Sequence, residues 1–419
     1  MAKILMIRLL KSQLKAWFLS LVSLGFLVIG EPLFWLMGQR RGTASELPKM
    51  KHILVLRFDQ IGDVVLTIPL LRELQKNSPG AHITVVVKPE IYDLISLCPY
   101  ADEVLTFDWH LSKRSQDYKR RLRAFKFCAA HLWHHKFDIA IIPRWDVDWY
   151  CQTFIAYFSG ARRRVGYSED VNLIKRIHNH GYDRLLTQFL HQKLVEHEVK
   201  RSLDILREIG GTATETHLEV WSAPADDNWA QTWLDETTNE NGPLIAFGPF
   251  VGNSALKQWP HSNFAALGRW LLAAYGGRIL LLGGSGDRTR AQRICDEIGQ
   301  GAENMAGSCS LPQTIALLKR CSLYVGDDSG PMHLASAAGI PVVALFGPSC
   351  PHRFSPWTSR KQLLWKQLPC SPCSVAGTGE NHADCCTVCI FPEPLCIQSI
   401  TVEEVQEAIK RTGFFANPV

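Results

Sequence analysis

Short apolar runs alternate with longer amphipathic stretches along most of the chain, and many of the apolar runs end in turns rich in glycine or acidic residues. Such runs predict buried strands, and the stretches between them predict helices. The predicted strands are 51–57, 81–87 and 137–143, followed by 244–247, 278–282, 323–325 and 342–346. The predicted helices are 64–75, 184–210, 261–275, 286–299 and 401–411. Thr401 and Glu404 form a capping box at the start of the last helix.

This alternation of strands and helices predicts parallel sheets with helical crossovers. A chain of 419 residues exceeds what one hydrophobic core usually supports, so we expect α/β architecture with two doubly wound domains that face each other across a cleft. The expected parts are a hydrophobic segment at 1–45, a first domain at 50–222, a linker at 223–242, a second domain at 243–400 and a terminal helix at 401–419. Ligands of such sheets bind at the carboxyl ends of the strands, so each domain is expected to bind one substrate.

The N-terminal segment differs from the rest of the chain. Residues 16–38 are apolar except for two serines and Glu31, and basic residues lie on both sides. About 20 apolar residues can span a bilayer, but the basic flanks on both sides give no clear orientation. We expect a membrane-associated anchor, either monotopic or spanning. The alternative is that the true chain begins near Met50.

The net charge of +5 is modest, but it is unevenly distributed. Seven Lys or Arg residues and one acid lie in 113–126, and an arginine triplet follows at 162–164. This pattern predicts either a surface for an anionic partner or a solvated helix face. The candidate contacts are Lys113, Arg120, Arg163 and Arg164. No nucleic-acid-binding motif accompanies the charge, so nucleic acid is not an expected partner.

The first predicted strand runs into a turn that contains Ile61, Gly62 and Asp63. Gly62 permits a tight turn, and Asp63 stands at the start of the next helix. A carboxylate exposed at a strand end can act as a general base on a hydroxyl. Aspartate is also a favoured helix N-cap, so spacing alone leaves both roles open.

Three turns in the second half contain groups suited to a sugar nucleotide. Residues 248–260 (GPFVGNSALKQWP) place small residues and Lys257 near a helix start, which indicates either a diphosphate cradle or an ordinary loop with a solvated lysine. Residues 282–288 (LGGSGDR) lack a full dinucleotide motif, and Asp287 either binds a ribose or lies in a first helical turn. Residues 326–333 (GDDSGPMH) lead into a helix N-terminus, which attracts phosphate, while the acid suits sugar hydroxyls.

Two residue sets raise the question of a metal ion. Asp146 and Asp148 could bind a metal with a sugar nucleotide, although a surface loop is the favoured interpretation. Six of the 13 cysteines fall within 27 residues, at Cys370, Cys373, Cys385, Cys386, Cys389 and Cys396. Four of them are candidate ligands of a structural zinc, namely Cys370, Cys373, Cys389 and Cys396. Thiols without a metal in a long loop are the alternative.

In their order and spacing, these turns resemble those of glycosyltransferase family 9, which contains the lipopolysaccharide heptosyltransferases. The matching pieces are Gly62-Asp63 with Pro69, Lys257-Gln258-Trp259-Pro260, Leu282-Gly283-Gly284, and Asp328-Ser329-Gly330-Pro331-Met332-His333 continuing to Phe346-Gly347-Pro348. The resemblance covers roughly residues 50–410 and leaves the N-terminal segment outside. It implies two Rossmann-like domains of the GT-B type, with the acceptor on the first and the donor on the second.

The resemblance also implies an inverting, metal-independent enzyme. It would move a sugar, expected to be heptose from ADP-heptose, to an anionic lipid-linked saccharide such as the lipopolysaccharide core, at the cytoplasmic face of the bacterial inner membrane. Asp63 would be the base, Lys257 would neutralise the departing diphosphate, and Asp328 would bind the donor sugar. The donor-binding residues so implied are Asn253, Ser254, Lys257, Gly283, Gly284, Asp287, Cys309, Asp328, Ser329, Gly330 and His333. No cofactor is expected for catalysis.

Two other functions stay open. A sugar-nucleotide epimerase on the same fold would release free nucleotide without any acceptor. An inactive protein that binds a sugar nucleotide or a lipid would leave the donor unchanged during long incubation with acceptors.

Overall fold

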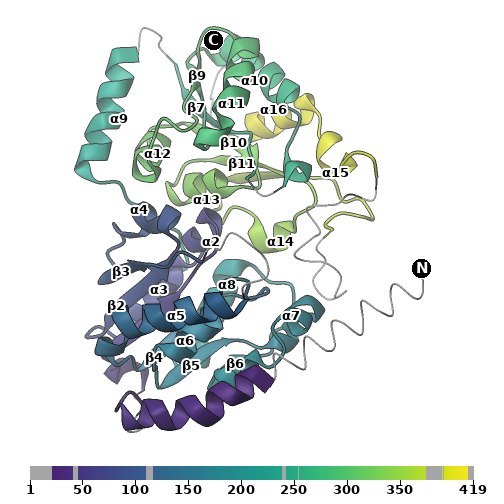
Figure 1. The fold of residues 1–419 in the computed structure, drawn as a ribbon. Helices are drawn as coiled ribbons and strands as arrows, with labels where there is room; N and C mark the ends of the chain where they lie inside the picture. The colour runs from purple at the N-terminus through teal and green to yellow at the C-terminus, as the bar shows by residue number, and fades with distance from the viewer. Residues whose placement is uncertain are drawn as a thin grey trace.

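The computed structural model describes residues 21–40, 46–109, 117–237, 242–252, 254–373, 389 and 391–413. These residues form two parallel sheets of six strands, one in each half of the chain (Figure 1). The first sheet contains β1 (His52–Leu56), β2 (His82–Val87), β3 (Glu103–Thr106), β4 (Ile139–Ile142), β5 (Arg163–Tyr167) and β6 (Gln188–Leu190). The second contains β7 (Leu244–Gly248), β8 (Arg278–Leu281), β9 (Ala302–Asn304), β10 (Leu323–Asp327), β11 (Val342–Phe346) and β12 (Lys361–Trp365).

The two sheets share one topology. Their strand orders are β3-β2-β1-β4-β5-β6 and β12-β11-β10-β7-β8-β9. Counted within each half, both orders are 3-2-1-4-5-6, so the winding reverses between β1 and β4 in the first sheet and between β7 and β10 in the second. The predicted class of two Rossmann-like, doubly wound α/β domains is confirmed.

Helices cover both faces of each sheet, which explains why the central strands are continuous apolar runs. In the first half these are α2 (Ile61–Val65), α3 (Ile68–Asn77), α4 (Tyr92–Ile95), α5 (Asp117–His131), α6 (Gln152–Phe158), α7 (Leu173–His178) and α8 (Glu198–Glu208). In the second half they are α9 (Pro224–Thr237), α10 (His261–Tyr275), α11 (Arg288–Ile298), α12 (Leu311–Leu318), α13 (Gly330–Ala337), α14 (Pro351–Phe354), α15 (Leu395–Gln398) and α16 (Val402–Arg411). Alternate residues of β1 enter different cores: Ile53 and Val55 pack in one cluster, Leu54 and Leu56 in the other.

The prediction of one helix over 184–210 was wrong. This stretch contains the end of a 3-10 turn, the edge strand β6 and then α8. β6 pairs with β5, with Gln188 opposite Val165, and such a ladder depends on a neighbour that local sequence does not reveal. The predicted linker at 223–242 contains α9, which packs against α12 of the second half. The capping box of Thr401 and Glu404 on α16 is present.

Residues 21–36 form a helix that lies along the first half, drawn in purple in Figure 1. One face of this helix packs on α6: the Phe26 ring lies 5.2 Å from that of Phe158, and the Tyr157 hydroxyl donates to the Phe26 carbonyl at 2.6 Å. The opposite face exposes apolar side chains, with Val28 and Ile29 67% and 72% exposed. In the part of the chain that the structure describes, no helix is both long and apolar enough to cross a membrane.

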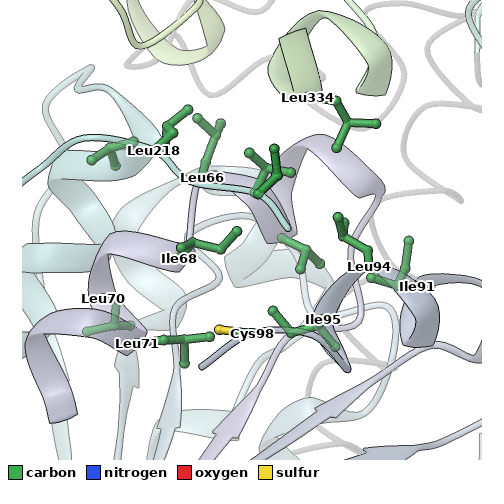
Figure 2. Packing of buried hydrophobic residues seen from close by; sticks show 14 of the residues in the cluster. Leu66, Ile68, Leu70, Leu71, Ile91, Leu94, Ile95, Cys98, Leu218 and Leu334 are labelled. Atoms are coloured by element: carbon green, nitrogen blue, oxygen red, sulfur yellow. The ribbon is translucent and has the colours of Figure 1, made fainter. Parts of the chain in front are cut away.

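The two halves share a hydrophobic contact. Buried side chains of α13, such as Met332 and Leu334, belong to one cluster with Leu66 and Leu94 of the first half. Figure 2 shows Leu334 above these first-half side chains. The contact lies beside α2, at the carboxyl end of β1, so it holds the two sheets together where ligands of doubly wound folds bind.

Candidate functional site

Three of the turns predicted to carry chemistry follow the first strand of each sheet and the fourth strand of the second sheet. Asp63 on α2 follows β1, residues 249–260 follow β7, and Asp328 with α13 follows β10. Parallel strands end at the same edge of a sheet, so these groups occupy the carboxyl edges at the reversal points.

Glycines allow the two carboxyl edges to touch. A Cβ atom on Gly62 would lie 2.5 Å from Cδ2 of His333, which is closer than real Cβ atoms approach. A Cβ atom on Gly330 would lie 3.0 Å from Cβ of Ile61, also a tight contact. The start of α2 therefore packs directly on the start of α13, and Asp63 lies one residue from this contact.

Asp63 combines a local structural bond with exposure to solvent. Its Oδ2 accepts a hydrogen bond from the Gln60 backbone N–H at 3.3 Å, as one half of a capping box in which Gln60 is the N-cap. The other oxygen lies 3.5 Å from Arg57 Nη2, and the side chain is 27% exposed. Burial raises the pKa of Asp63 and Glu198 adds to this, while Arg57, the Gln60 amide and Arg353 oppose it. A carboxylate with a raised pKa holds an abstracted proton more strongly, which suits a general base.

Sequence reasoning missed the ion pairs that Asp59, near Asp63 in the chain, forms with Arg57 and Arg144. Arg57 Nη1 lies 3.2 Å from Asp59 Oδ2 and donates to the Pro143 carbonyl at 3.1 Å. Arg144 also pairs with Asp59. Asp59 is 3% exposed and forms ion pairs with both arginines, whereas Asp63 is the more accessible carboxylate. The only sequence signal was a pair of charges at the end of an apolar strand.

In the second half, Lys257 and Asp328 form a buried ion pair. Lys257 Nζ lies 2.9 Å from Asp328 Oδ2, and the two side chains are 13% and 7% exposed. Burial alone would raise the pKa of Asp328, but Lys257 and His333 lower it below its usual value, so the carboxylate is ionised. Burial lowers the pKa of His333 to about 4 against the opposing effect of Asp328, so this imidazole is neutral at pH 7.

The neighbouring Asp327 has a structural role. It is fully buried and accepts the Trp259 backbone N–H at 3.1 and 3.3 Å. The indole N–H of Trp259 donates to the Ile400 carbonyl at 2.8 Å. These bonds fix the loop that presents Lys257. Asp327 therefore holds the loop, and the adjacent Asp328 pairs with the lysine.

The remaining donor-side candidates lie on loops of the second half. Ser254 accepts the Leu256 N–H at 3.3 Å, and Asp287 accepts the Gly284 N–H at 2.9 Å and pairs with Arg290. Both side chains therefore stabilise local turns. Gly283 and Gly284 follow β8, and Ser329 and Gly330 follow β10, so all four lie near the carboxyl edge of the second sheet. Cys309 is half-buried, and burial raises the pKa of its thiol to about 11. Asn253 lies outside the described residues.

The arginines proposed for the acceptor lie in structural positions. Arg163 is the first residue of β5, at the amino end of the strand, and donates to Gln188 Oε1 at 2.8 Å. Arg164 is 4% exposed, donates to the Leu185 carbonyl at 2.6 Å and lies 3.3 Å from Glu31. Arg120 of α5 stacks over the Trp109 ring, with its guanidinium carbon 5.5 Å from the ring centre. Lys113 lies outside the described residues.

Sequence reasoning also missed a cation at the carboxyl edge of the first sheet, Lys88. Lys88 directly follows β2, is 6% exposed, and has its Nζ 4.8 Å from the centre of the Tyr150 ring. Burial lowers the pKa of Lys88, whereas the charges of Glu90 and Asp63 raise it. Since β2 pairs with β1, this ammonium group lies at the same carboxyl edge of the sheet as the candidate base.

Asp146 and Asp148 have protein partners. Asp146 accepts from Arg353 of α14 at 2.7 Å, and the same guanidinium bonds Glu198 at 2.7 Å, so this ion pair network bridges the two halves. Asp148 accepts the backbone N–H groups of residues 150, 152 and 153 at the start of α6. Both carboxylates thus organise the protein, and the interpretation of a surface loop was wrong for Asp148, which is 6% exposed.

Four cysteines of the C-terminal cluster lie among the described residues, namely Cys370, Cys373, Cys389 and Cys396, but no three of their thiols lie within 4.8 Å of one another. Burial, followed by the charges of Cys373, Cys370 and Cys389, raises the pKa of Cys396 to about 11. Zinc binds the deprotonated thiolate, so a bound ion would hold these thiols in the ionised form. The other candidates of the cluster, Cys385 and Cys386, lie outside the described residues.

Comparisons with known proteins agree on one family. The profile of glycosyltransferase family 9 (heptosyltransferase) matches residues 148–383. Lipopolysaccharide heptosyltransferase 2 of Escherichia coli K12 is 26% identical over 329 residues, covering 74% of this chain and 86% of that protein. A glycosyl transferase family 9 structure from Veillonella parvula superposes with a TM-score of 0.71 at 21% identity, covering 89% and 99%. The structure of the E. coli ADP-heptose lps heptosyltransferase II gives 0.63 at 20%, covering 86% and 98%.

Proposed function

The chain belongs to glycosyltransferase family 9 and is a glycosyltransferase, and we propose that it transfers heptose from ADP-heptose to an anionic lipid-linked saccharide such as the lipopolysaccharide core. The observation that carries this proposal is the direct contact between the start of α2, which bears Asp63, and the start of α13, which follows Asp328 of the Lys257–Asp328 pair. In this proposal, a proton acceptor and a cation for a diphosphate flank the reacting bond. The names of the relatives support the sugar and the acceptor class.

The proposed reaction is a single displacement with inversion at the anomeric carbon. Asp63 takes the proton of the acceptor hydroxyl as its oxygen forms the new bond to that carbon. The bond to the diphosphate breaks, and ADP leaves with the electron pair. Lys257 neutralises the charge that grows on the leaving group, and the N-terminus of α13 adds its dipole. Interactions that strengthen as this charge develops lower the barrier most.

Asp328 has two tasks in this scheme. It holds Lys257 in place by the 2.9 Å ion pair, and its second oxygen can accept from a sugar hydroxyl. The neutral His333 beside it adds a polar group without adding positive charge. On the acceptor side we propose Lys88 as a contact for an anionic group, because it lies at the carboxyl end of β2 and is coupled to Asp63.

Membrane association is part of the same proposal. The helix at 21–36 presents an apolar outer face, and exposed aliphatic chains on a helix suit the boundary between lipid headgroups and acyl chains. A lipid-linked acceptor lies at such a surface. We propose that the protein works at the cytoplasmic face of the bacterial inner membrane.

We propose that catalysis requires no metal ion, and that Cys370, Cys373, Cys389 and Cys396 hold a structural zinc. Tetrahedral sulfur sites of this kind stabilise a fold and leave no open position for substrate. Transfer should survive brief treatment with EDTA, while metal analysis of a Cys370→Ser variant should show one zinc fewer than the wild type. Loss of transfer on chelation, restored by magnesium, would contradict the first part.

Product analysis tests the proposed reaction directly. The full chain is incubated with ADP-heptose, with and without a lipid-linked acceptor, and ADP, free sugar and extended acceptor are measured. Heptosyl transfer predicts ADP release only when acceptor is present, with one sugar added per ADP. Release of free nucleotide without acceptor would favour the epimerase, and an unchanged donor would favour a binding protein.

A further inference from the structure

A cluster of side chains that can bind a metal lies at the amino edge of the first sheet, opposite the carboxyl edge that bears the site described above. His82, Glu103 and His135 place one potential ligand atom each within 4.8 Å of one another. His135 Nε2 lies 3.1 Å from Glu103 Oε2, and His82 Nε2 lies 4.0 Å from the same oxygen. We propose that these three residues form a binding site for a divalent transition metal ion, with zinc as the best match to the ligand types.

The strand register explains why these side chains converge. His82 is the first residue of β2 and Glu103 is the first residue of β3. Glu103 is paired with Thr84, and residues two apart on a strand point to the same face, so His82 and Glu103 share one face of the sheet. His135 ends the short 3-10 turn before β4, and the following Lys136 has a φ of 52°, which turns the chain back toward the sheet.

The distances fit an ion with little movement. Ligand atoms about 2.0–2.2 Å from a tetrahedral zinc lie roughly 3.3–3.6 Å apart, and the observed separations of 3.1 and 4.0 Å bracket this range. Two imidazoles and a carboxylate are a common zinc set that leaves a fourth position for water. Side-chain rotation of the half-exposed His82 suffices to adjust the longer distance.

Neighbouring groups provide support around the three ligands. The Thr84 hydroxyl donates to Glu103 Oε2 at 3.0 Å and orients the carboxylate. His52, the first residue of β1, lies with its ring centre 6.0 Å from that of His82 and 6.1 Å from that of His135. Its Nδ1 is buried and has no hydrogen-bond partner among the described residues. An additional imidazole is therefore available beside the ligands.

The test compares zinc content and thermal stability of four full-length proteins. These are the wild type, His82→Ala, Glu103→Gln and, as a matched control, His131→Ala, which removes an exposed histidine of α5 outside the cluster. After dialysis against Zn²⁺ and removal of loosely bound ions, zinc is counted per chain by mass spectrometry. Zinc at the cysteine cluster contributes equally to all four proteins, so only differences between them matter.

We expect His82→Ala and Glu103→Gln each to hold one zinc fewer than the wild type, and His131→Ala to match the wild type. Added Zn²⁺ should raise the Tm of the wild type and the control by more than that of the two cluster variants. Equal zinc counts and equal Tm shifts in all four proteins would overturn the proposal and reduce the cluster to a histidine–glutamate ion pair. His82 is 40% exposed, so its replacement is a safe test even where Glu103→Gln disturbs folding.

Discussion

At the scale of single residues, Asp63 shows how one carboxylate serves both a helix and a reaction. One oxygen closes the capping box with Gln60, which fixes the side chain, and the other faces Arg57 at a longer distance. Fixing a base in this way lowers the entropy lost when the substrate binds. The cost is a partly buried negative charge, as the raised pKa indicates.

Asp63→Asn should therefore separate activity from stability. Loss of the base should lower heptosyl transfer by about 10²–10⁴-fold. The pKa of Asp63 is raised in the folded state, so the ionised form disfavours folding as pH rises above the usual aspartate value, and the neutral amide should leave the Tm at pH 7 unchanged or higher. Initial rates and thermal melts at pH 7 test both points.

The matched control is Glu404→Gln, which alters the equivalent capping-box residue of α16. This variant should keep wild-type transfer rates. Transfer by Asp63→Asn within a factor of two or so of the wild type would refute the role of Asp63 as base.

The Lys257–Asp328 pair allows a second prediction at this scale. Lys257→Ala leaves Asp328 ionised and buried without its 2.9 Å partner, which should reduce the free energy of unfolding by roughly 3 kcal/mol. Adding Asp328→Asn removes the unpaired charge and should restore most of that stability, but not turnover. Urea denaturation and steady-state kinetics on both variants measure the two effects. Equal stability of the single and double variants would contradict this account.

At the scale of elements, periodicity identified most of the inner strands but missed the inner strand β5 and the edge strands. The runs at 51–57 and 342–346 became β1 and β11, because strands buried on both faces are continuously apolar. β5 begins with two arginines, and β9 is only three residues long, so neither carries a strong local signal. Their hydrogen-bond ladders depend on neighbours distant in sequence.

The same reasoning explains what could be predicted of the site. The glycine and acid turns at residues 62–63 and 326–330 are local, so the sequence indicated both sides of the candidate centre. Arg57 was missed because its importance comes from Asp59 and Arg144, and the latter lies 87 positions further along the chain. Arg353 was missed because its partners lie in the other half. Paired charges are recognised only once the fold brings them together.

The helix at 21–36 supports a prediction at this scale. Replacing both Val28 and Ile29 by Gln removes two highly exposed aliphatic side chains and leaves the face packed on α6 unchanged. Each side chain buried at a membrane surface contributes about 1 kcal/mol or more, so binding to vesicles with anionic lipids should weaken at least ~10-fold. Leu173→Gln on α7, which is 51% exposed, is the control. Co-sedimentation that is unchanged by the double substitution would contradict membrane docking through this face.

At the scale of the whole molecule, the halves are held by apolar packing, by Arg353 and by a histidine. His197 at the start of α8 donates from Nε2 to the Ser355 carbonyl at 2.8 Å, and its ring lies 4.4 Å from that of Trp357. Both partners belong to the second half. A protonated imidazole is disfavoured there, because burial lowers the pKa of His197 to about 4.

Stability should therefore fall as the pH is lowered from about 6.5 to 4. In this window the unfolded chain binds a proton that folded His197 does not, so acidification favours unfolding. The effect of a shift from 6.5 to about 4 is at most about 3 kcal/mol for this residue. Urea titrations of the wild type and His197→Gln between pH 4 and 7 measure it. The variant should show a shallower pH dependence, and identical slopes would contradict the assignment.

The close approach of Gly62 to His333 and of Gly330 to Ile61 has a mechanical consequence. If one half rotated as a rigid body against the other about this contact, the outer loops would move far. Atoms near the axis of rotation would move very little. The outer rims of the two halves could then open and close for substrates. The distance between Asp63 and the Lys257–Asp328 pair would stay nearly constant through each cycle. The axis of this rotation would pass through the candidate active site.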